Sequence, residues 1–120
     1  MSLPETSLTP HPVIQAQLEA YNHHDAEAFA ATYAADAEII ELATDNLLAQ
    51  GTAAIQAFYA ARFEAHPQLH AEILQRVLQG PFVIDQERIT GLDDARLPAR
   101  TAVVIYELRE DRIARAWLVH

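Results

Sequence analysis

Apolar positions in the first half of the chain recur every three or four residues, which is the period of an amphipathic helix. Asp25 and Thr52 belong to the residue types that favour the N-cap of a helix, and Pro67 is a residue that ends one. The pattern therefore predicts three helices, over residues 12–22, over residues 26–34 and from Thr52 to Pro67.

The second half of the chain has a different period. After Pro67 apolar and polar residues alternate, as they do in strands with one buried face. Strict alternation places Ala71 and Arg76 on opposite faces of the first of these strands. We predict turns at Gly80-Pro81 and Glu110-Asp111, polar loops over residues 43–50 and 92–99, a short strand over residues 38–42, and four longer strands over residues 69–78, 82–90, 100–109 and 112–120.

This order of elements predicts an α+β fold, with three N-terminal helices packed in the concave face of a curved, mostly antiparallel sheet. Long strands joined by short turns have to curve to wrap three helices, and the result is a cone-shaped α+β barrel that is open at one end. The interior of such a cone suits a small apolar ligand. We expect residues 1–11 to be a flexible leader and residues 12–120 to be a single domain.

The amino-acid composition excludes several kinds of catalytic and metal site. The 120 residues include no cysteine and no lysine, and the only serines are Ser2 and Ser7. Thiolate metal sites, cysteine nucleophiles and Schiff-base lysines are therefore excluded. Any chemistry has to use carboxylates, histidines, tyrosines or arginines.

The net charge of the chain argues against some kinds of binding partner. The net charge of −9, with 17 acidic and 8 basic residues, argues against nucleic acid and anionic membranes, which attract clustered positive charge. No apolar run approaches the ~20 residues of a bilayer span. Pro67 separates His66 from His70, so these histidines lack a metal-binding spacing, although a site from His70, Glu72 and a distant residue stays open. We expect a cytoplasmic protein with no cofactor and no metal.

Four short stretches occur in order along residues 12–120: Tyr21-Asn22-His23-His24-Asp25, Tyr33-Ala34-Ala35-Asp36-Ala37-Glu38-Ile39, Gly51-Thr52-Ala53-Ala54-Ile55 with Phe58-Tyr59, and Asp111-Arg112-Ile113-Ala114-Arg115-Ala116-Trp117. In this order they resemble the nuclear transport factor 2-like superfamily, and within it the SnoaL-like and ketosteroid-isomerase-like group. The resemblance implies a cystatin-like α+β fold. That fold hosts isomerases, polyketide cyclases, dehydratases and proteins without catalysis.

The resemblance carries over only part of the steroid isomerase site. Glu41 occupies the position of the isomerase general base in the first strand. Gln17 stands where the isomerases have an oxyanion-binding tyrosine, and Val104 or Ile105 stands where they have a protonated aspartate, so the two oxyanion donors are not matched. The SnoaL-like cyclases have an acid–base aspartate on the last strand, and the nearest polar residue here is His120.

Glu41 and His120 are the catalytic candidates. A carboxylate held in an apolar cone can move protons near neutral pH, although a solvated position of Glu41 at the strand edge is the alternative. Asp85 and Glu87 leave their strand on the same face. They either bind ligand inside the cone or lie on the exposed face of the sheet and pair with Arg76, Arg100 or Arg109.

Aromatic and apolar residues complete the candidate surfaces. Four tyrosines, each with an apolar ring and a hydroxyl, are predicted to line the cone as ligand-binding residues or to pack in the core: Tyr21, Tyr33, Tyr59 and Tyr106. We expect a homodimer through the outer sheet face, which is too apolar to leave in water and consists of Val103, Ile105, Ile113, Trp117 and Val119.

Together these features predict a small-molecule-binding SnoaL-like protein. Its activity would be that of a cofactor-free isomerase, cyclase or dehydratase, steroid Δ-isomerase-like or polyketide-cyclase-like, using carboxylate acid–base catalysis on an apolar ligand. The alternative is a non-catalytic ligand-binding or dimerisation module of the same fold. Convergence of Glu41, Asp85 and Glu87 in one pocket would favour the enzyme.

Overall fold

The computed structural model describes residues 11–92 and 99–120. In these residues the helices are α1 (Pro12–Asn22), α2 (Ala26–Ala31) and α3 (Thr52–Ala65). The strands are β1 (Tyr33–Glu41), β2 (Asn46–Gln50), β3 (His70–Gln79), β4 (Phe82–Thr90), β5 (Ala99–Arg109) and β6 (Arg112–Val119). Residues 1–10 of the leader expected over residues 1–11, and most of the loop expected over residues 92–99, lie outside the described residues. His11, the last residue of the expected leader, is the N-cap of α1, and its side chain accepts a hydrogen bond from the Ile14 amide.

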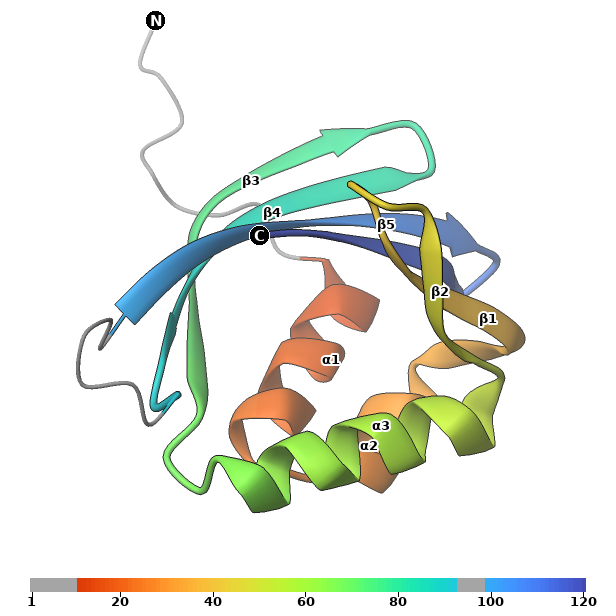
Figure 1. The fold of residues 1–120 in the computed structure, drawn as a ribbon. Coiled ribbons are helices and arrows are strands. Elements are labelled where there is room, and N and C mark those ends of the chain that lie inside the picture. The colour runs from red at the N-terminus through yellow and green to blue at the C-terminus, as the bar shows by residue number, and fades with distance from the viewer. Residues whose placement is uncertain (1–10, 93–98) are drawn as a thin grey trace, which may run out of the picture.

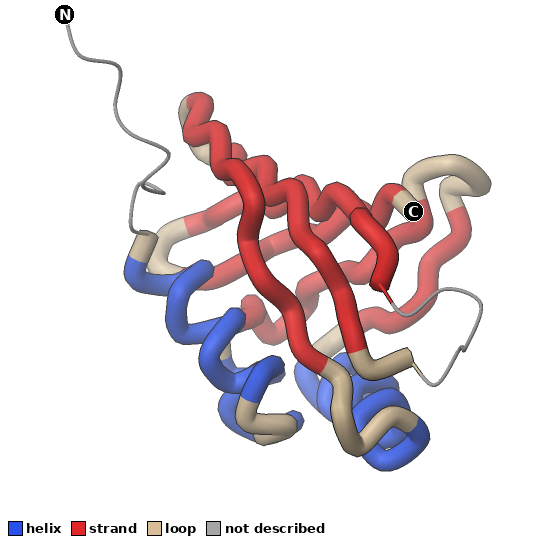
Figure 2. Tube along the Cα trace, turned by 90° about the vertical axis from the view of Figure 1, so that its left-hand side faces the viewer, coloured by secondary structure: helices blue, strands red, loops and turns tan. Residues whose placement is uncertain are grey.

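The strands of the described residues form one six-stranded sheet in the order β2-β1-β6-β5-β4-β3. Strands β1 and β6 are parallel, and the other neighbours are antiparallel. The sheet curves over the helices, which all lie on its concave side (Figures 1 and 2). This arrangement confirms the predicted α+β class. None of the described helices is long and apolar enough to cross a membrane.

The segment after α2 enters the sheet earlier than predicted. The helix expected over residues 26–34 ends at Ala31, and β1 begins at Tyr33. Tyr33 pairs with Ile113 of β6, and the Thr32 carbonyl accepts a hydrogen bond from the Ile113 amide at 2.9 Å. Pairing with a strand from the far end of the chain overrides the local helical period.

The loop expected over residues 43–50 contains a strand, β2, which forms a hairpin with β1. Asp45 adopts a φ of 59° in the turn, a left-handed conformation that aspartate tolerates better than most residues. Strand β2 has five residues at the edge of the sheet, and Leu47 is 50% exposed. In a short edge strand few side chains are buried, so β2 lacks the alternation of apolar and polar residues by which the longer strands are predicted.

Glycine, and not the predicted Thr52, caps helix α3. Gly51 holds the N-cap position with a φ of 85°, which glycine adopts without strain, and Thr52 is the first helical residue. The Gly51 amide donates a hydrogen bond to the Ala37 carbonyl at 2.8 Å, so the start of α3 is fixed to β1. The N-cap predicted for α2 is confirmed, since Asp25 accepts a hydrogen bond from the Ala28 amide at 3.0 Å.

The hydrophobic core lies between the helices and the concave face of the sheet. Its fully buried side chains come from both layers and include Ile14, Phe29, Ile39, Ile55 and Leu69. Ile113 also belongs to this core with 0% exposure, so its predicted place on the outer face is wrong. After the exposed Arg112, strand β6 has two consecutive buried residues, Ile113 and Ala114, and the register with both neighbouring strands shifts here.

Candidate functional site

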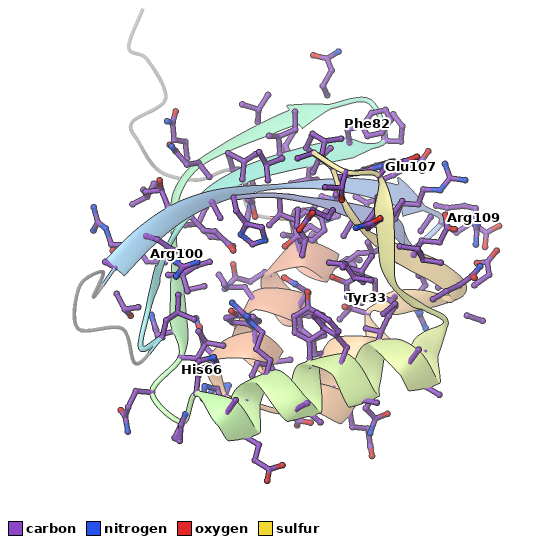
Figure 3. All side chains as sticks on the ribbon, in the orientation of Figure 1. Tyr33, His66, Phe82, Arg100, Glu107 and Arg109 are labelled. Atoms are coloured by element: carbon purple, nitrogen blue, oxygen red, sulfur yellow. The ribbon has the colours of Figure 1, made fainter. Side chains whose placement is uncertain are left out.

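A cavity of about 110 Å³ lies between the concave face of the sheet and the helices α1 and α3. Figure 3 shows Tyr33 in this space between the sheet and α3. Because one water molecule occupies ~30 Å³ in the liquid, the cavity suits a molecule of about one ring. The apolar part of its wall includes Leu18, Leu48, Phe58, Ile89, Val104 and Leu118. The polar part consists of Gln17, Tyr21, Tyr33, Tyr59, Tyr106, Arg62, Glu87 and His120.

All four tyrosines predicted for the cone line this cavity. Burial is the largest cause that raises the pKa of each phenol, and the negative charge of Glu87 raises all four further. Glu87 therefore lies close to tyrosines that come from α1, β1, α3 and β5. With raised pKa values the phenols keep their protons at neutral pH and are available as hydrogen-bond donors.

Glu87 is the carboxylate of the cavity. Burial raises its pKa to about 7, the neighbouring Asp85 raises it as well, and the positive charge of Arg62 partly opposes the shift. Its register neighbours in the sheet are Ile73 and Ala102, so no cation faces it across either strand pair. A carboxyl group that titrates near neutral pH can both accept and donate a proton under physiological conditions.

Asp85 lies two residues before Glu87 on the same face of β4, but it does not line the cavity. Its side chain is 1% exposed and accepts two hydrogen bonds from Arg76, at 2.6 Å from Nε and at 2.9 Å from a terminal nitrogen. Asp85 and Arg76 therefore form a buried ion pair. The alternative prediction named the correct partner, Arg76, but placed the pair on the exposed face.

A β-bulge explains why strict alternation misplaced Arg76. The register between β3 and β4 shifts between Ile73 and Gln75, so the inward and outward positions of β3 exchange at this point. Ala71 before the bulge is buried in the core, and Arg76 after the bulge is paired with the inward-facing Asp85. The extra residue turns a side chain predicted for the outer face into an internal one.

Glu41 does not join the other two carboxylates. In the sheet it is paired with Leu118, which lines the cavity, but Glu41 is the last residue of β1 and is not part of the cavity wall. Its carboxylate accepts a hydrogen bond from the Thr44 hydroxyl at 2.7 Å, on the exposed turn of the β1–β2 hairpin. The structure therefore brings Asp85 and Glu87 to one face and leaves Glu41 at the strand end.

The two ends of the cavity differ in polarity. His120 lines the cavity and is exposed, which places it at the mouth. Deeper inside, Gln17 is 7% exposed and accepts a hydrogen bond from the Tyr106 hydroxyl at 3.4 Å. Gln17 and Val104, the positions where the resemblance lacks the isomerase donors, both belong to the wall. In the part of the chain that the structure describes, no group of three or more histidine or acidic side chains is placed to hold a metal ion.

Arg62 is the cavity residue that the sequence reading did not single out. It comes from the last turn of α3 and lines the cavity beside Tyr21 and Glu87. The signal was present, because Arg62 falls at helical spacing with the apolar residues Ile55 and Tyr59, and an arginine on an apolar stripe needs a reason to be there.

Comparison with known proteins places this fold in a family. The family model of the SnoaL-like domain matches residues 14–116, so the chain belongs to the SnoaL-like family. One fold can host different activities, so membership of the family does not decide the activity of this chain. No curated protein matches the chain.

Solved structures of the same fold share little sequence with this chain. An uncharacterised cystatin-fold protein from Novosphingobium aromaticivorans is 23% identical, with a TM-score of 0.81 over 90% of this chain and 95% of that one. A protein with a ketosteroid isomerase-like fold from Catenulispora acidiphila, in complex with trimethylamine, is 18% identical, with a TM-score of 0.82 over 93% of this chain and 87% of that one. A candidate polyketide cyclase from Sinorhizobium meliloti is 22% identical, with a TM-score of 0.77 over 91% of this chain and 94% of that one. At these identities the likeness defines the fold alone.

Proposed function

We propose that this chain binds a small, mainly apolar molecule in the cavity and moves a proton on it without a cofactor, with Glu87 as the acid–base group. One observation carries the proposal: Glu87 stands in an apolar cavity, surrounded by four tyrosines, with a pKa raised to about 7 by burial and by Asp85. The known complex of the Catenulispora acidiphila structure with trimethylamine supports small-molecule binding by this fold.

The reaction that fits these groups is a proton shift next to a carbonyl. The Glu87 carboxylate removes a proton from the carbon beside the carbonyl, and the electron pair moves onto the carbonyl oxygen as an enolate. A neutral tyrosine hydroxyl donates a hydrogen bond to that oxygen and stabilises its charge. In a β,γ-unsaturated ketone this enolate is a conjugated dienolate. The protonated Glu87 then returns the proton to the γ carbon of the dienolate, which moves the carbon–carbon double bond and completes an isomerisation.

This proposal transfers the role of base from Glu41 to Glu87. Glu41 stays a candidate, but its hydrogen bond to Thr44 is on an exposed turn, and Glu41 is not part of the cavity wall. A base outside the cavity lacks the tyrosine hydroxyls that can stabilise an enolate oxygen beside Glu87. We also retain His120 as a residue of the cavity mouth that contacts a bound molecule.

The test compares the two glutamates directly. Exchange of deuterium from solvent into the position beside the carbonyl of a small unsaturated ketone reports the proton step without knowledge of the natural substrate. We expect Glu87→Gln to slow this exchange by about 10²- to 10⁴-fold, the usual contribution of a general base. Glu72→Gln, an exposed change of the same kind on β3, serves as the matched control. Loss of exchange in Glu41→Gln with full activity in Glu87→Gln would return the role to Glu41.

A binding module without catalysis is the second candidate, and one observation favours it. The Tyr106 hydroxyl is directed at Gln17, and the position of the isomerase acid is the apolar Val104 or Ile105, so part of the donor set of an isomerase is missing. Under this alternative, ketones raise the melting temperature of the chain by binding, and neither Glu87 nor Glu41 affects the exchange of deuterium.

We further propose a homodimer through the outer face of the sheet. Ile84, Ile105, Trp117 and Ile40 are register neighbours across β4, β5, β6 and β1, and Val77 at the β3 end of this row is 53% exposed. Burial of such a row against a second copy removes it from water. We expect a dimer by sedimentation and a monomer for Ile105→Glu. Ala61→Glu, at an exposed position of α3 away from the outer sheet face, is the control. A monomeric natural chain would contradict this. The cytoplasmic location stays a prediction.

A further inference from the structure

We infer that the cavity takes a small carboxylate, which places its anionic group on the guanidinium of Arg62 and the hydroxyl of Tyr21 and its apolar body against the opposite wall. This inference rests on the proposed binding role of the cavity and names the chemical class of the ligand. It does not require that the bound molecule reacts.

Arg62 reaches the cavity from a helix and meets a phenol there. It lines the cavity together with Tyr21 of α1, and its charge and hydrogen bond act on the Tyr21 hydroxyl against the effect of burial on the pKa of that phenol. A guanidinium and a neighbouring phenol offer several N–H and O–H donors to one acceptor. This is the donor set that binds a carboxylate with two or more hydrogen bonds.

The protein supplies no carboxylate within ion-pair distance of Arg62 among its described residues. Four other arginines of the described part each have one, namely Arg76 with Asp85, Arg88 with Glu72, Arg109 with Asp36 and Arg115 with Glu38. Acidic residues are not scarce, since the chain has 17 of them against 8 arginines. The arginine that faces the cavity is therefore left with donors for a molecule from outside.

Glu87 does not fill this role, although it lies in the same cavity. The charge of Arg62 acts on Glu87, but the two side chains do not come within the 4.0 Å of an ion pair in the described structure. A ligand carboxylate bound to Arg62 forms an ion pair with its guanidinium and neutralises the positive charge that acts on Glu87. It also favours the protonated form of Glu87, because two carboxylates in one apolar cavity repel each other.

The shape and the wall of the cavity limit the rest of the ligand. A volume of about 110 Å³ holds about one ring beside the carboxylate, and not a fused four-ring skeleton. Leu18, Leu48, Phe58, Val104 and Leu118 give this ring an apolar and aromatic surface. The resulting class is a monocyclic or short branched carboxylic acid.

The experiment compares three probes of one size in isothermal titration calorimetry at pH 6: benzoate, its uncharged analogue benzamide, and the cation benzylammonium. We expect benzoate to bind on the order of 10- to 100-fold more tightly than benzamide, which is the contribution of a charge-assisted pair. Arg62→Gln removes this preference because it weakens benzoate binding much more than benzamide binding. Arg88→Gln, which removes an equal charge from an exposed ion pair, keeps it.

The pH dependence is a second readout. The groups that face Glu87 are Asp85 on its own strand, Arg62 from α3 and the phenols of Tyr21, Tyr33, Tyr59 and Tyr106. His120 shares the cavity at its mouth. The pKa of Glu87 is raised to about 7. Benzoate affinity therefore falls by about 3- to 10-fold from pH 6 to pH 8 as Glu87 ionises, and Glu87→Gln removes the fall.

Three results would overturn the inference: equal affinities for benzoate and benzamide, a preference for benzylammonium, or an equal loss of both neutral and anionic probes in Arg62→Gln. If Arg62→Gln does not fold, the Nε resonance of Arg62 in the natural chain replaces it. That resonance shifts with benzoate and not with benzamide, and its failure to shift contradicts the inference. Benzoate binding through Arg62 without any Glu87-dependent deuterium exchange would support this inference and contradict the proposed catalysis. Glu87-dependent exchange without any preference for benzoate would contradict this inference and support the catalysis.

Discussion

Asp85 and Glu87 are two carboxylates on one face of one strand, and their surroundings give them opposite roles. Asp85 is opposite Arg76 across the β3–β4 pair and holds it with two hydrogen bonds, with 1% of the side chain exposed. Glu87 is opposite Ile73, and its pKa is raised to about 7. The difference teaches that cross-strand register, rather than residue type or strand face, decides which carboxylate is structural and which is available for chemistry.

The largest effect is expected where the buried pair is broken. Asp85→Asn keeps the shape of the side chain but removes the charge that receives Arg76, and removal of one partner from a buried ion pair costs about 3–5 kcal/mol. Denaturant unfolding at pH 7 measures this loss as a lower midpoint with an unchanged slope. A loss below about 1 kcal/mol would mean that the pair is no more important than a surface pair.

A smaller effect of opposite sign is expected at Glu87, and it depends on pH. Because its folded pKa of about 7 lies above the ordinary value of 4.5, the folded state holds the proton more tightly, and stability falls as pH rises from about 4.5 to 7. Full burial of the ionised Glu87 carboxylate would lower the stability of the fold by about 3 kcal/mol. Glu87 lines an open cavity, so solvent screening makes the loss smaller. We expect Glu87→Gln to stabilise the chain by about 1–2 kcal/mol at pH 8 and to have little effect at pH 5.

Denaturant midpoints at the two pH values check this prediction. Equal midpoints of Glu87→Gln and the natural chain at pH 8 would show that the ionised carboxylate is not penalised in the fold. A destabilised variant at both pH values would show instead that Glu87 has a structural role like that of Asp85.

The hydroxyl of Tyr106 is expected to contribute less. Its hydrogen bond to Gln17 is long, at 3.4 Å, and a net contribution of about 0.5–1 kcal/mol is typical of a neutral pair. Tyr106→Phe should therefore lower stability by this amount and leave the pH dependence of stability in place. Loss of the pH dependence in this variant would mean that the hydroxyl, and not the apolar wall, determines the environment of Glu87.

The exposed ion pair of Glu72 and Arg88 is expected to contribute least to the free energy of unfolding. Their side chains are 59% and 50% exposed at a separation of 3.1 Å. Surface pairs of this kind contribute about 0–1 kcal/mol, and Glu72→Gln should stay within that range in the same unfolding measurement. A loss as large as that of Asp85→Asn would remove the distinction between buried and exposed carboxylates on which the comparison depends.

The sequence was sufficient for the architecture because its signals are long and repeated. The alternation in β4 and β5 and the helical period of α1 and α3 agree with the structure, and Tyr21, Tyr33, Tyr59 and Tyr106 are on the expected side. The parity of β4 placed Asp85 and Glu87 on one face, which the structure confirms.

What the sequence could not provide depends on register between distant segments. The bulge between Ile73 and Gln75 leaves no mark in the residues around it, yet it moves Arg76 to the inside. Pairing of Tyr33 with Ile113 shortens α2, and the same irregular register places Ile113 in the core. The resemblance points to Glu41 as the base because it transfers a sequence position, whereas our proposal of Glu87 depends on which carboxylate lines the cavity.

The central claim is that Glu87 is the titrating group of the cavity. Its side-chain carboxyl carbon, labelled with ¹³C and assigned by its absence in Glu87→Gln, reports ionisation directly in an NMR titration from pH 3 to pH 9. The account predicts a midpoint near 7, as burial and Asp85 require. A midpoint near the ordinary 4.5 of a glutamate in water would contradict it.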